Sequence, residues 1–403
     1  MRYFNYLQGN EDFFFKSPQP FTNKSSKEII AHAVGAALYM PATRPNIANE
    51  LVSGKIQGLV TAVIDLEDAV GDNQLEVAEK NLCVQLYRIL KLKKQGVITE
   101  EDIPLIFVRV RTPEQMKRII AVLEETIEVI TGFTLPKFSL VNGQQFLSLI
   151  HGYNQGKSSC APTLYAMPIL ETSDVIYRET RMQTLLDIKD LLNCYKEYVL
   201  NVRIGATDFS SLFGLRRNPD MTIYDIGVIR DCIADIINVF GRFDDPYVIS
   251  GPVWEYFKSD RVLKPQLRQT PFEEAAGKQG RLIRMDYINM YVDGLIRETV
   301  LDKENGIIGK TIIHPSHLLP VQSMYVVTHE EYIDAMNIIA NNDGSFGVLK
   351  SQYENKMIEI KPHLNWAKRI ILRSQIYGVL HENQNYTTLL IETRGFEQTQ
   401  AHV

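Results

Sequence analysis

The stretch YVLNVRIGATDFSSLFGLRR, residues 198–217, decides the fold that the sequence predicts. It begins as an aliphatic run, and at Gly205 it turns into a polar loop that presents Asp208. Such a run is typical of a buried parallel strand, and α/β barrels carry their chemistry at the ends of these strands. Asp208 is therefore either a site residue or an Asp that caps the following turn. The recurrence of the same pattern along the chain favours the site.

Eight short apolar runs alternate with segments whose apolar residues have helical spacing. The runs are 36–41, 61–68, 105–110, 133–137, 164–171, 198–205, 246–251 and 306–315. Strict alternation of β and α elements at this count favours an α/β fold of the (β/α)8 TIM-barrel type over a doubly wound sheet. No GxGxxG turn follows the first run and no GxxxxGK[ST] loop occurs, so a nucleotide-binding sheet has little support.

Composition and charge narrow the class of protein. The 403 residues are 45% hydrophobic and 23% charged, as in an ordinary globular protein. A net charge of −5 gives no general attraction to nucleic acid or to an anionic membrane. The four cysteines form no CxxC pair, which is typical of reduced thiols rather than of a metal cluster. Without a signal-peptide pattern or an apolar run of membrane-spanning length, we expect a cytoplasmic protein.

Charged residues fall at or just after the ends of the predicted strands. They are Arg44, Asp65, Glu67, Asp68, Arg109, Lys137, Glu171, Asp208 and His314. In a closed barrel these ends converge on one mouth. A solvated rim would also be polar, but the strands are otherwise so apolar that charges of a rim should be carried by helices. We therefore predict one site at the mouth.

Glu171 and Asp208, from adjacent strands, are a natural pair of ligands for Mg²⁺, with Mn²⁺ as an alternative, because a hard cation takes a few carboxylates and keeps positions for water or substrate oxygens. An arginine at the end of the third strand could stabilise an enolate beside that metal. The sequence has no nucleophilic Ser or Cys motif and no phosphate cradle. This set of residues indicates enolate chemistry, in which a C–C bond next to a carbonyl is made or broken.

Two further residues allow two interpretations each. His314 could act as an acid or base near neutral pH, or it could be a histidine held by its neighbours before Pro315. Lys137 could form a Schiff base if it were desolvated. A positive charge that holds an acidic loop is the better interpretation of Lys137, since a metal site makes an imine unnecessary.

Six segments resemble, in order, the signature segments of the HpcH/HpaI aldolase and citrate lyase beta-subunit superfamily. They are TAVIDLEDAVGD, FVRVR, LPK, PILET, RIGATDFSSLFG and GIIGKTIIHP, and with the first strand they span residues 36–315. The variants GATDFSSLFGLRR and SGPVWEYF, together with the long N-terminal extension, look most like the barrel C–C bond lyases that are encoded in bacterial tellurite-resistance and stress gene clusters.

The resemblance implies a TIM barrel, a divalent metal and the cleavage or formation of a C–C bond, often in an acyl thioester. It also implies residue roles. Glu171 and Asp208 match the Mg²⁺ ligands, and Arg109 matches the arginine that contacts the metal-bound oxo acid and the enolate. Arg44 matches an arginine that contacts substrate or phosphate. The acidic residues that would support the metal waters and Arg109 are Asp65, Glu67 and Asp68.

The resemblance extends beyond the barrel to a C-terminal helical lid that covers the active site of a neighbouring subunit. The matching segments are residues 328–331, 356–359 and a helix over 363–376. In several members an Asp after the KMI segment is the proposed acid/base, and here it is Glu359, whose extra methylene displaces the carboxylate. Arg111 stands where relatives often have Asn, which suggests a more anionic substrate. We expect an extension over 1–30, the barrel over 31–320, the lid over 321–382 and a tail over 383–403.

These observations predict a Mg²⁺-dependent C–C lyase or aldolase that acts on a 2-oxo acid or an acyl thioester. Arg109 would stabilise the enolate, and the substrate-binding set would be Arg44, Arg111, Lys137 and His314. A lid that acts in trans requires a homo-oligomer. Thioester hydrolysis at the same site is an alternative, and so is a barrel that binds without catalysis. The sequence does not choose between coenzyme A, a carrier-protein thioester and neither.

Overall fold

The computed structural model describes the chain except for residues 8–9, 160, 258–270, 290–291, 346 and 392–403. The chain divides into two compact units. The first, here called the barrel unit, consists of Met1, Phe21–Phe257 and Gly294–Leu318. The second unit consists of Arg2–Pro20, Lys258–Asp293 and Leu319–Val403. The predicted extension of residues 1–30 is thus divided between the units.

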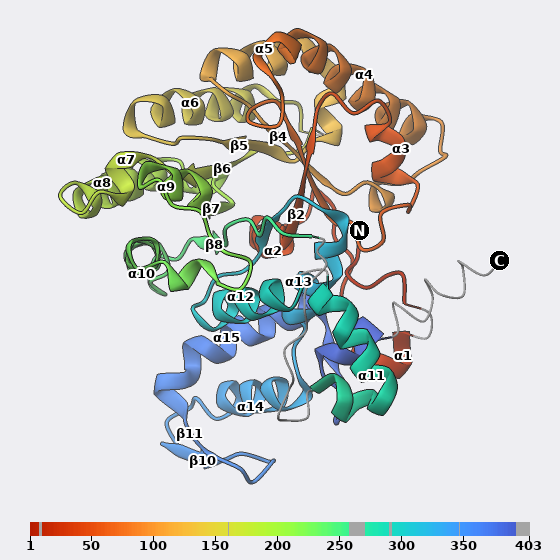
Figure 1. Ribbon diagram of the computed structural model, residues 1–403, viewed down its shortest axis with the longest axis vertical. Helices are drawn as coiled ribbons and strands as arrows, with labels where there is room; N and C mark the ends of the chain where they lie inside the picture. Colours follow the sequence, from red (N-terminus) through yellow and green to blue (C-terminus); the bar gives the residue numbers. More distant parts are fainter. Residues whose placement is uncertain (8–9, 160, 258–270, 290–291, 346, 392–403) are drawn as a thin grey trace. The chain divides into compact units, whose positions relative to one another are not determined.

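The barrel unit contains the eight parallel strands that the sequence predicts (Figure 1). They are β2 (Ala36–Pro41), β3 (Thr61–Asp65), β4 (Leu105–Arg109), β5 (Gly132–Leu135), β6 (Tyr165–Leu170), β7 (Asn201–Ile204), β8 (Val248–Ser250) and β9 (Lys310–Ile312). Their order is β8-β7-β6-β5-β4-β3-β2-β9. Backbone N–H groups of Ile308 and Thr311 donate to Ile249 and Gly251 and close the ring between β8 and β9. The TIM-barrel prediction is confirmed.

The strands are buried on both faces, as parallel strands covered by helices are. All five residues of β3, TAVID, are buried, and its β-branched side chains suit a pleated, packed surface. The strand ends at Asp65 because the Asp65 carboxylate accepts the backbone N–H groups of Glu67 and Ala69 and turns the chain. Glu67 and Asp68, which the sequence placed within the strand, therefore lie on the loop that follows it.

Helices follow the strands and lie outside them, as α4, α5 and α6 do in Figure 1. In the barrel unit they are α2 (Lys27–Ala33), α3 (Ile47–Val52), α4 (Leu75–Lys94), α5 (Pro113–Leu123), α6 (Leu140–Gly156), α7 (Ser173–Ile176), α8 (Arg181–Cys194), α9 (Ala206–Leu212) and α10 (Gly227–Phe240). Helix α12 (Val292–Glu304) belongs to this unit from Gly294 onwards. Short 3-10 turns lie at Asp72–Gln74, Glu100–Asp102, Glu124–Val129, Lys196–Tyr198, Ile223–Asp225 and Pro315–His317.

A largely buried group of charges, here called the α12 network, joins α12 to β9. The Lys310 ammonium lies 2.8 Å from Glu298 Oε1 and 2.7 Å from Asp302 Oδ2, and all three side chains are 0% exposed. Arg217 pairs with Glu298 and with Glu255. The Tyr224 hydroxyl also donates to Asp302 Oδ1. Each charge in this network faces an opposite charge.

The second unit is mainly helical. Its elements are α1 (Asn10–Phe13), β1 (Phe14–Lys16), α11 (Pro271–Asn289), α14 (His329–Ala340), β10 (Val348–Lys350), β11 (Met357–Glu359), α15 (Ile360–Tyr377) and β12 (Val379–Leu380), with α13 (Leu318–Met324) at its border. Helices α14 and α15 share an apolar core that includes Ile338, Ile360 and Ile370. Thr328 and Glu331 form a capping box at the start of α14. Both helices lie where the sequence predicts helices.

The start of the predicted tail is packed within the second unit. Residues 386–391 are helical, and Leu389 and Leu390 are 0% exposed. Residues 392–403 lie outside the described part of the chain. Among the described helices, none is both long enough and apolar enough to cross a membrane.

Candidate active site

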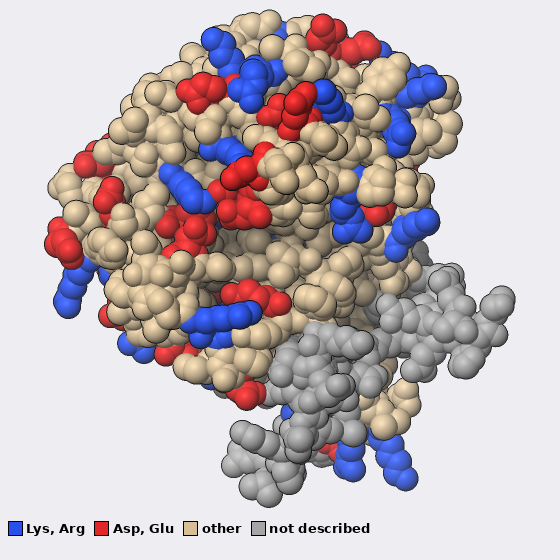
Figure 2. All heavy atoms as spheres, turned by 45° about the horizontal axis from the view of Figure 1, so that its top comes forward, with Lys and Arg blue, Asp and Glu red and all other residues tan. Residues whose placement is uncertain are grey.

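A cavity of about 420 Å³ opens at the C-terminal ends of the barrel strands. It is lined by residues from seven of the strands or the loops after them, among them Tyr39, Asp65, Asp68, Arg109, Glu171, Arg203, Asp208 and Thr311. Figure 2 shows acidic and basic side chains gathered beside a hollow in the face that it draws. The strand-end charges predicted to converge on one mouth thus do so for Asp65, Asp68, Arg109, Glu171 and Asp208.

Arg109, the last residue of β4, is surrounded by three carboxylates. Its Nε and Nη2 donate to Asp65 Oδ1 and Oδ2 at 2.7 and 2.6 Å, a bidentate pair. Its Nη1 lies 2.9 Å from Glu67 Oε2 and 3.2 Å from Asp68 Oδ2. Burial would lower the pKa of Arg109, but Asp65 and Glu67 raise it above the usual value. The guanidinium therefore stays charged and is fixed in one orientation at the cavity wall.

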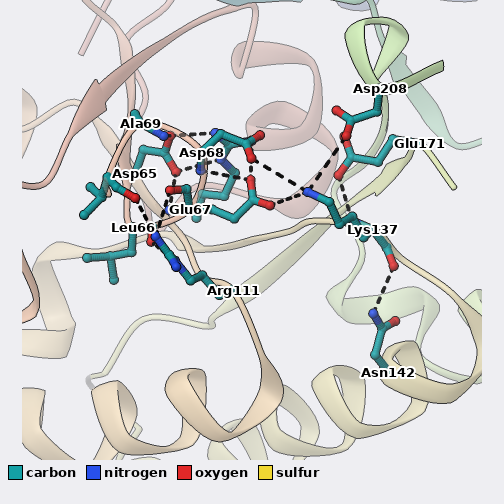
Figure 3. Close-up of polar contacts among 12 residues, drawn as sticks. Asp65, Leu66, Glu67, Asp68, Ala69, Arg111, Lys137, Asn142, Glu171 and Asp208 are labelled. Carbon is teal, nitrogen blue, oxygen red and sulfur yellow. Dashed lines mark hydrogen bonds and ion pairs between the residues drawn. The ribbon is translucent and has the colours of Figure 1, made fainter. Parts of the chain in front are cut away.

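Lys137 joins the acidic loop after β3 to the carboxylates of β6 and α9, as Figure 3 shows. Its ammonium pairs with Glu67 and lies 3.8 Å from Asp68 Oδ1 and 3.9 Å from Asp208 Oδ1. Its backbone N–H donates to Glu171 Oε1 at 2.7 Å. Burial alone would lower the pKa of Lys137, but Glu67 and Asp68 raise it. These contacts fit the interpretation of Lys137 as a positive charge that holds the acidic loop.

Glu171 follows β6 and is only 5% exposed. Burial, and next the negative charge of Asp208, raise the pKa of Glu171 to about 8. The adjacent Gly205 makes room for this carboxylate, because a Cβ at that position would lie 2.2 Å from Glu171 Oε2. Asp208 comes from the first turn of α9 and lines the same cavity. The two carboxylates thus share a confined space in which their charges repel each other.

The charges at the mouth do not balance. Among the described residues, the five carboxylates of Asp65, Glu67, Asp68, Glu171 and Asp208 outnumber the cations of the mouth, which are Arg109, Lys137 and Arg203. Within the described residues, no three His, Cys, Asp or Glu side chains are close enough together to form a protein cage around a metal ion. Mg²⁺ does not need such a cage, since it is usually held by one or two carboxylates and keeps several waters. Glu171 and Asp208 therefore fit a Mg²⁺ ion that is bound partly by solvent or substrate oxygens.

None of the four predicted substrate-binding residues lines the cavity, and Lys137 instead lies among the carboxylates described above. Arg111 donates from Nε to Leu66 O at 2.8 Å and from Nη2 to Val70 O at 2.5 Å, and it forms an ion pair with Asp72. Its contacts therefore hold the acidic loop after β3. Arg44 pairs with Glu50 on α3 at 3.0 Å. His314 stacks on Phe257 and bonds to Ser316, as in the interpretation of a histidine held by its neighbours.

The sequence model of a family described as C–C bond lyases of the TIM-barrel fold matches residues 28–379. The chain belongs to this family. The predicted likeness to barrel C–C bond lyases is thereby confirmed. The resemblance to the wider HpcH/HpaI aldolase and citrate lyase beta-subunit superfamily and the association with tellurite-resistance gene clusters stay predictions. No curated protein matches the chain.

Two solved structures are similar to this C–C bond lyase chain. A citrate lyase from Burkholderia xenovorans is 13% identical with a TM-score of 0.53, and the match covers 85% of this chain and 91% of that one. The protein CitE from Mycobacterium tuberculosis, in complex with magnesium, acetoacetate and coenzyme A, is 18% identical with a TM-score of 0.48 over 84% of this chain and 97% of that one. Because the sequence identity is so low, the similarity to the citrate lyase from Burkholderia xenovorans supports only the barrel fold of this chain.

Sequence reasoning about this C–C bond lyase missed two residues of the cavity. Tyr39 and Arg203 both line it, and the guanidinium carbons of Arg109 and Arg203 lie 5.3 and 5.8 Å from the centre of the Tyr39 ring. The signal for Arg203 was present in NVRIG, where Asn201 and Arg203 are the polar residues of a buried strand, two positions apart. Glu359 lies in the second unit, where it is exposed at the start of α15.

Proposed function

We propose that the chain is a Mg²⁺-dependent carbon–carbon lyase or aldolase that acts on a 2-oxo acid through a stabilised enolate. The observation that carries the proposal is the pair of Glu171 and Asp208 in one cavity with the fixed cation of Arg109. Family membership supports the reaction class. A Mg²⁺ ion held by the two carboxylates would act as a Lewis acid on the carbonyl group of the acid.

Arg109 would stabilise negative charge on a substrate oxygen. The bidentate pair with Asp65 fixes the orientation of the Arg109 guanidinium before the substrate binds. The guanidinium therefore does not have to reorient when negative charge develops on the substrate oxygen. Glu67 and Asp68 neutralise part of its charge, and Lys137 in turn holds Glu67. The acidic loop is therefore a support for Arg109, and Arg111 secures that loop through its backbone carbonyls.

The proton at the substrate carbon needs a separate group. We propose that Glu359, supplied by a neighbouring copy of the chain, carries it, because the sequence around it resembles the lid of the superfamily. Its carboxylate is exposed and thus free to approach a site outside its own unit. A homo-oligomer is part of this proposal, and a monomeric protein with full turnover would contradict it.

Calorimetric titration of the metal-stripped protein with Mg²⁺ tests the metal pair. We expect oxaloacetate, pyruvate or glyoxylate to bind only when Mg²⁺ is present, and Glu171→Gln and Asp208→Asn to lose both metal and acid. Mn²⁺ is titrated in parallel as the alternative ion. The matched control is Glu76→Gln on α4, whose side chain is 82% exposed, and it should bind like the wild type.

Two outcomes would change the proposal. Unaltered Mg²⁺ affinity in both variants would show that the site is assigned wrongly, and undetectable Mg²⁺ binding would favour a barrel without catalysis. When an acyl thioester is the second substrate, release of free thiol without a new C–C bond would identify a hydrolase.

A further inference from the structure

Arg203 is a buried cation that lines the cavity. It lies in β7 with 1% of its surface exposed. Its Nη2 donates to the Thr311 hydroxyl at 2.9 Å, and its guanidinium lies over the Tyr39 ring. Its Nε and Nη1 have no hydrogen-bond partner, and it forms no ion pair with any residue that the structure describes. Two of its donor nitrogens are thus unsatisfied in the interior of the barrel.

Other buried arginines of the barrel unit are compensated. Arg109 has three carboxylates within 3.2 Å, Arg217 pairs with Glu298 and Glu255, and Arg181 lies 2.9 Å from Asp235. Moving an ion from water into a protein interior is strongly unfavourable unless a counter-charge offsets the loss of hydration. Since no carboxylate of the described residues pairs with Arg203, the structure points to an anion that enters the cavity.

The place of Arg203 along β7 separates this anion from the metal pair. Arg203 lies within β7, whereas Gly205 directly follows the last residue of the strand. Gly205 is the residue whose missing side chain makes room for Glu171. Arg203 lies two positions earlier, roughly 7 Å deeper along the strand by the usual rise. A group that pairs with Arg203 is therefore distinct from one held between Glu171 and Asp208.

We propose that Arg203 binds a second carboxylate of the substrate, so that the chain selects 2-oxo acids that carry two carboxylates. The inference rests on the proposed function, in which the 2-oxo acid end lies at Glu171 and Asp208. The guanidinium offers Nε and Nη1 to the carboxylate, and the Thr311 hydroxyl fixes its rotation through Nη2. Arg203 is thus a specificity-determining residue of the barrel interior.

The test compares acids of equal chain length with one or two carboxylates. Oxaloacetate is paired with 2-oxobutyrate and 2-oxoglutarate with 2-oxopentanoate, each titrated by calorimetry in saturating Mg²⁺. For at least one pair, we expect the wild type to bind the dicarboxylate at least tenfold more tightly. Arg203→Met should reduce that preference to within twofold and leave the affinity for Mg²⁺ and for the monocarboxylate unchanged. Arg203→Lys should keep part of the preference, and Arg118→Met, an exposed arginine of α5, should keep all of it.

A second measurement separates binding from a structural role. Without ligand, Arg203→Met should melt at the same temperature as the wild type or higher, because it removes an uncompensated buried charge. A large fall in melting temperature would overturn the assignment of Arg203 to the ligand. The preference for dicarboxylates is measured on the wild type alone, so it tests the substrate class even if Arg203→Met does not fold.

The failures of the two proposals can be told apart. If the wild type binds monocarboxylates and dicarboxylates equally, and only with Mg²⁺, the inference is wrong and the proposed function stands. If no 2-oxo acid binds with Mg²⁺, both are wrong. If inorganic phosphate binds in a manner that Arg203→Met abolishes, while no dicarboxylate is preferred, the anion is a phosphoryl group and the carboxylate assignment is wrong.

Discussion

Lys310 and Lys137 each place an ammonium group between two carboxylates of the barrel, but their surroundings differ. Lys310 and its partners are 0% exposed, whereas the Lys137 side chain is 50% exposed. Burial would lower the pKa of Lys310 and raise that of Glu298, yet the opposite charges in the α12 network outweigh burial for both. At the mouth, burial prevails instead and raises the pKa values of Glu67 and Glu171.

The difference teaches where the barrel tolerates unpaired charge. In the α12 network every charged group forms an ion pair within the network, and these pairs join α12 to β9. The mouth keeps an excess of carboxylates together with Arg203, a cation that forms no ion pair with the described residues, and this arrangement costs stability. Such a cost is expected where a protein keeps groups ready for a ligand. The comparison therefore predicts opposite consequences when charges are removed from the two regions.

The largest effect is expected from Lys310→Met. The change leaves Glu298 and Asp302 buried next to each other without their shared cation, and should lower the free energy of unfolding by about 3–5 kcal/mol. Urea denaturation measures the loss. Lys80→Met, on the surface of α4, is the matched control and should change the unfolding energy by less than about 0.5 kcal/mol. If Lys310→Met lowered the free energy of unfolding by less than about 1 kcal/mol, which is typical of an exposed ion pair, the two regions would not differ in this respect.

A pH series of the metal-free protein probes the mouth. In the unfolded chain the pKa of Glu171 is near its usual value of 4.5, but in the folded protein this pKa is raised to about 8. Unfolding therefore releases a proton between these values, and stability falls as pH rises through this window by up to about 1.4 kcal/mol per unit. Melting curves of the wild type and Glu171→Gln in the presence of a chelator measure the contribution. Parallel curves for both proteins between pH 5 and 8 would contradict the raised pKa.

Gly205→Ala displaces a carboxylate without removing it. The new Cβ would collide with Glu171, so we expect a loss of about 1–3 kcal/mol in unfolding energy together with weaker Mg²⁺ binding. Gly152→Ala on α6 is the control, because no atom lies within 4 Å of its added Cβ, and it should stabilise the protein by about 0.5–1 kcal/mol. Equal effects of the two substitutions would show that Gly205 does not shape the site.

The smallest effect on stability is expected from Lys137→Met. Because the Lys137 side chain is half exposed, its ion pairs should contribute less than about 1 kcal/mol to the unfolding energy. Mg²⁺ should bind at least as tightly to the variant, since a cation near Asp208 has been removed. Denaturation and calorimetry on the same sample check both outcomes. A loss as large as that of Lys310→Met would mean that the two regions follow the same rule.

Local patterns in the sequence were sufficient for the fold and for part of the site. Each predicted run overlaps a strand, because apolar residues and strand-end turns are properties of neighbouring residues. The prediction that Asp65, Asp68, Arg109, Glu171 and Asp208 meet at one cavity followed from the barrel, which brings the strand ends together. The roles given to Glu171 and Asp208 as metal ligands, and to Glu359 as acid/base, stay predictions.

The residues that the sequence placed less well depend on contacts that leave no local pattern. The acceptors of Arg111 are the carbonyls of Leu66 and Val70, which every residue possesses, so the sequence offered no reason to remove Arg111 from the substrate site. Arg203 was overlooked because β7 is buried on both faces, and apolar residues on both sides conceal which side chains point inward.

The closure of the barrel also governs its synthesis. Strand β2 pairs with β3 soon after both have left the ribosome, but its other edge pairs with β9, about 270 residues later. At 5–20 residues per second, β9 emerges roughly 15–55 s after β2. Throughout this interval the nascent chain carries an apolar strand, AALYMP, with one unpaired edge that can add to another chain. Whatever slows translation before residue 310 prolongs that exposure, so the speed of the ribosome sets how long an unfinished barrel is open to aggregation.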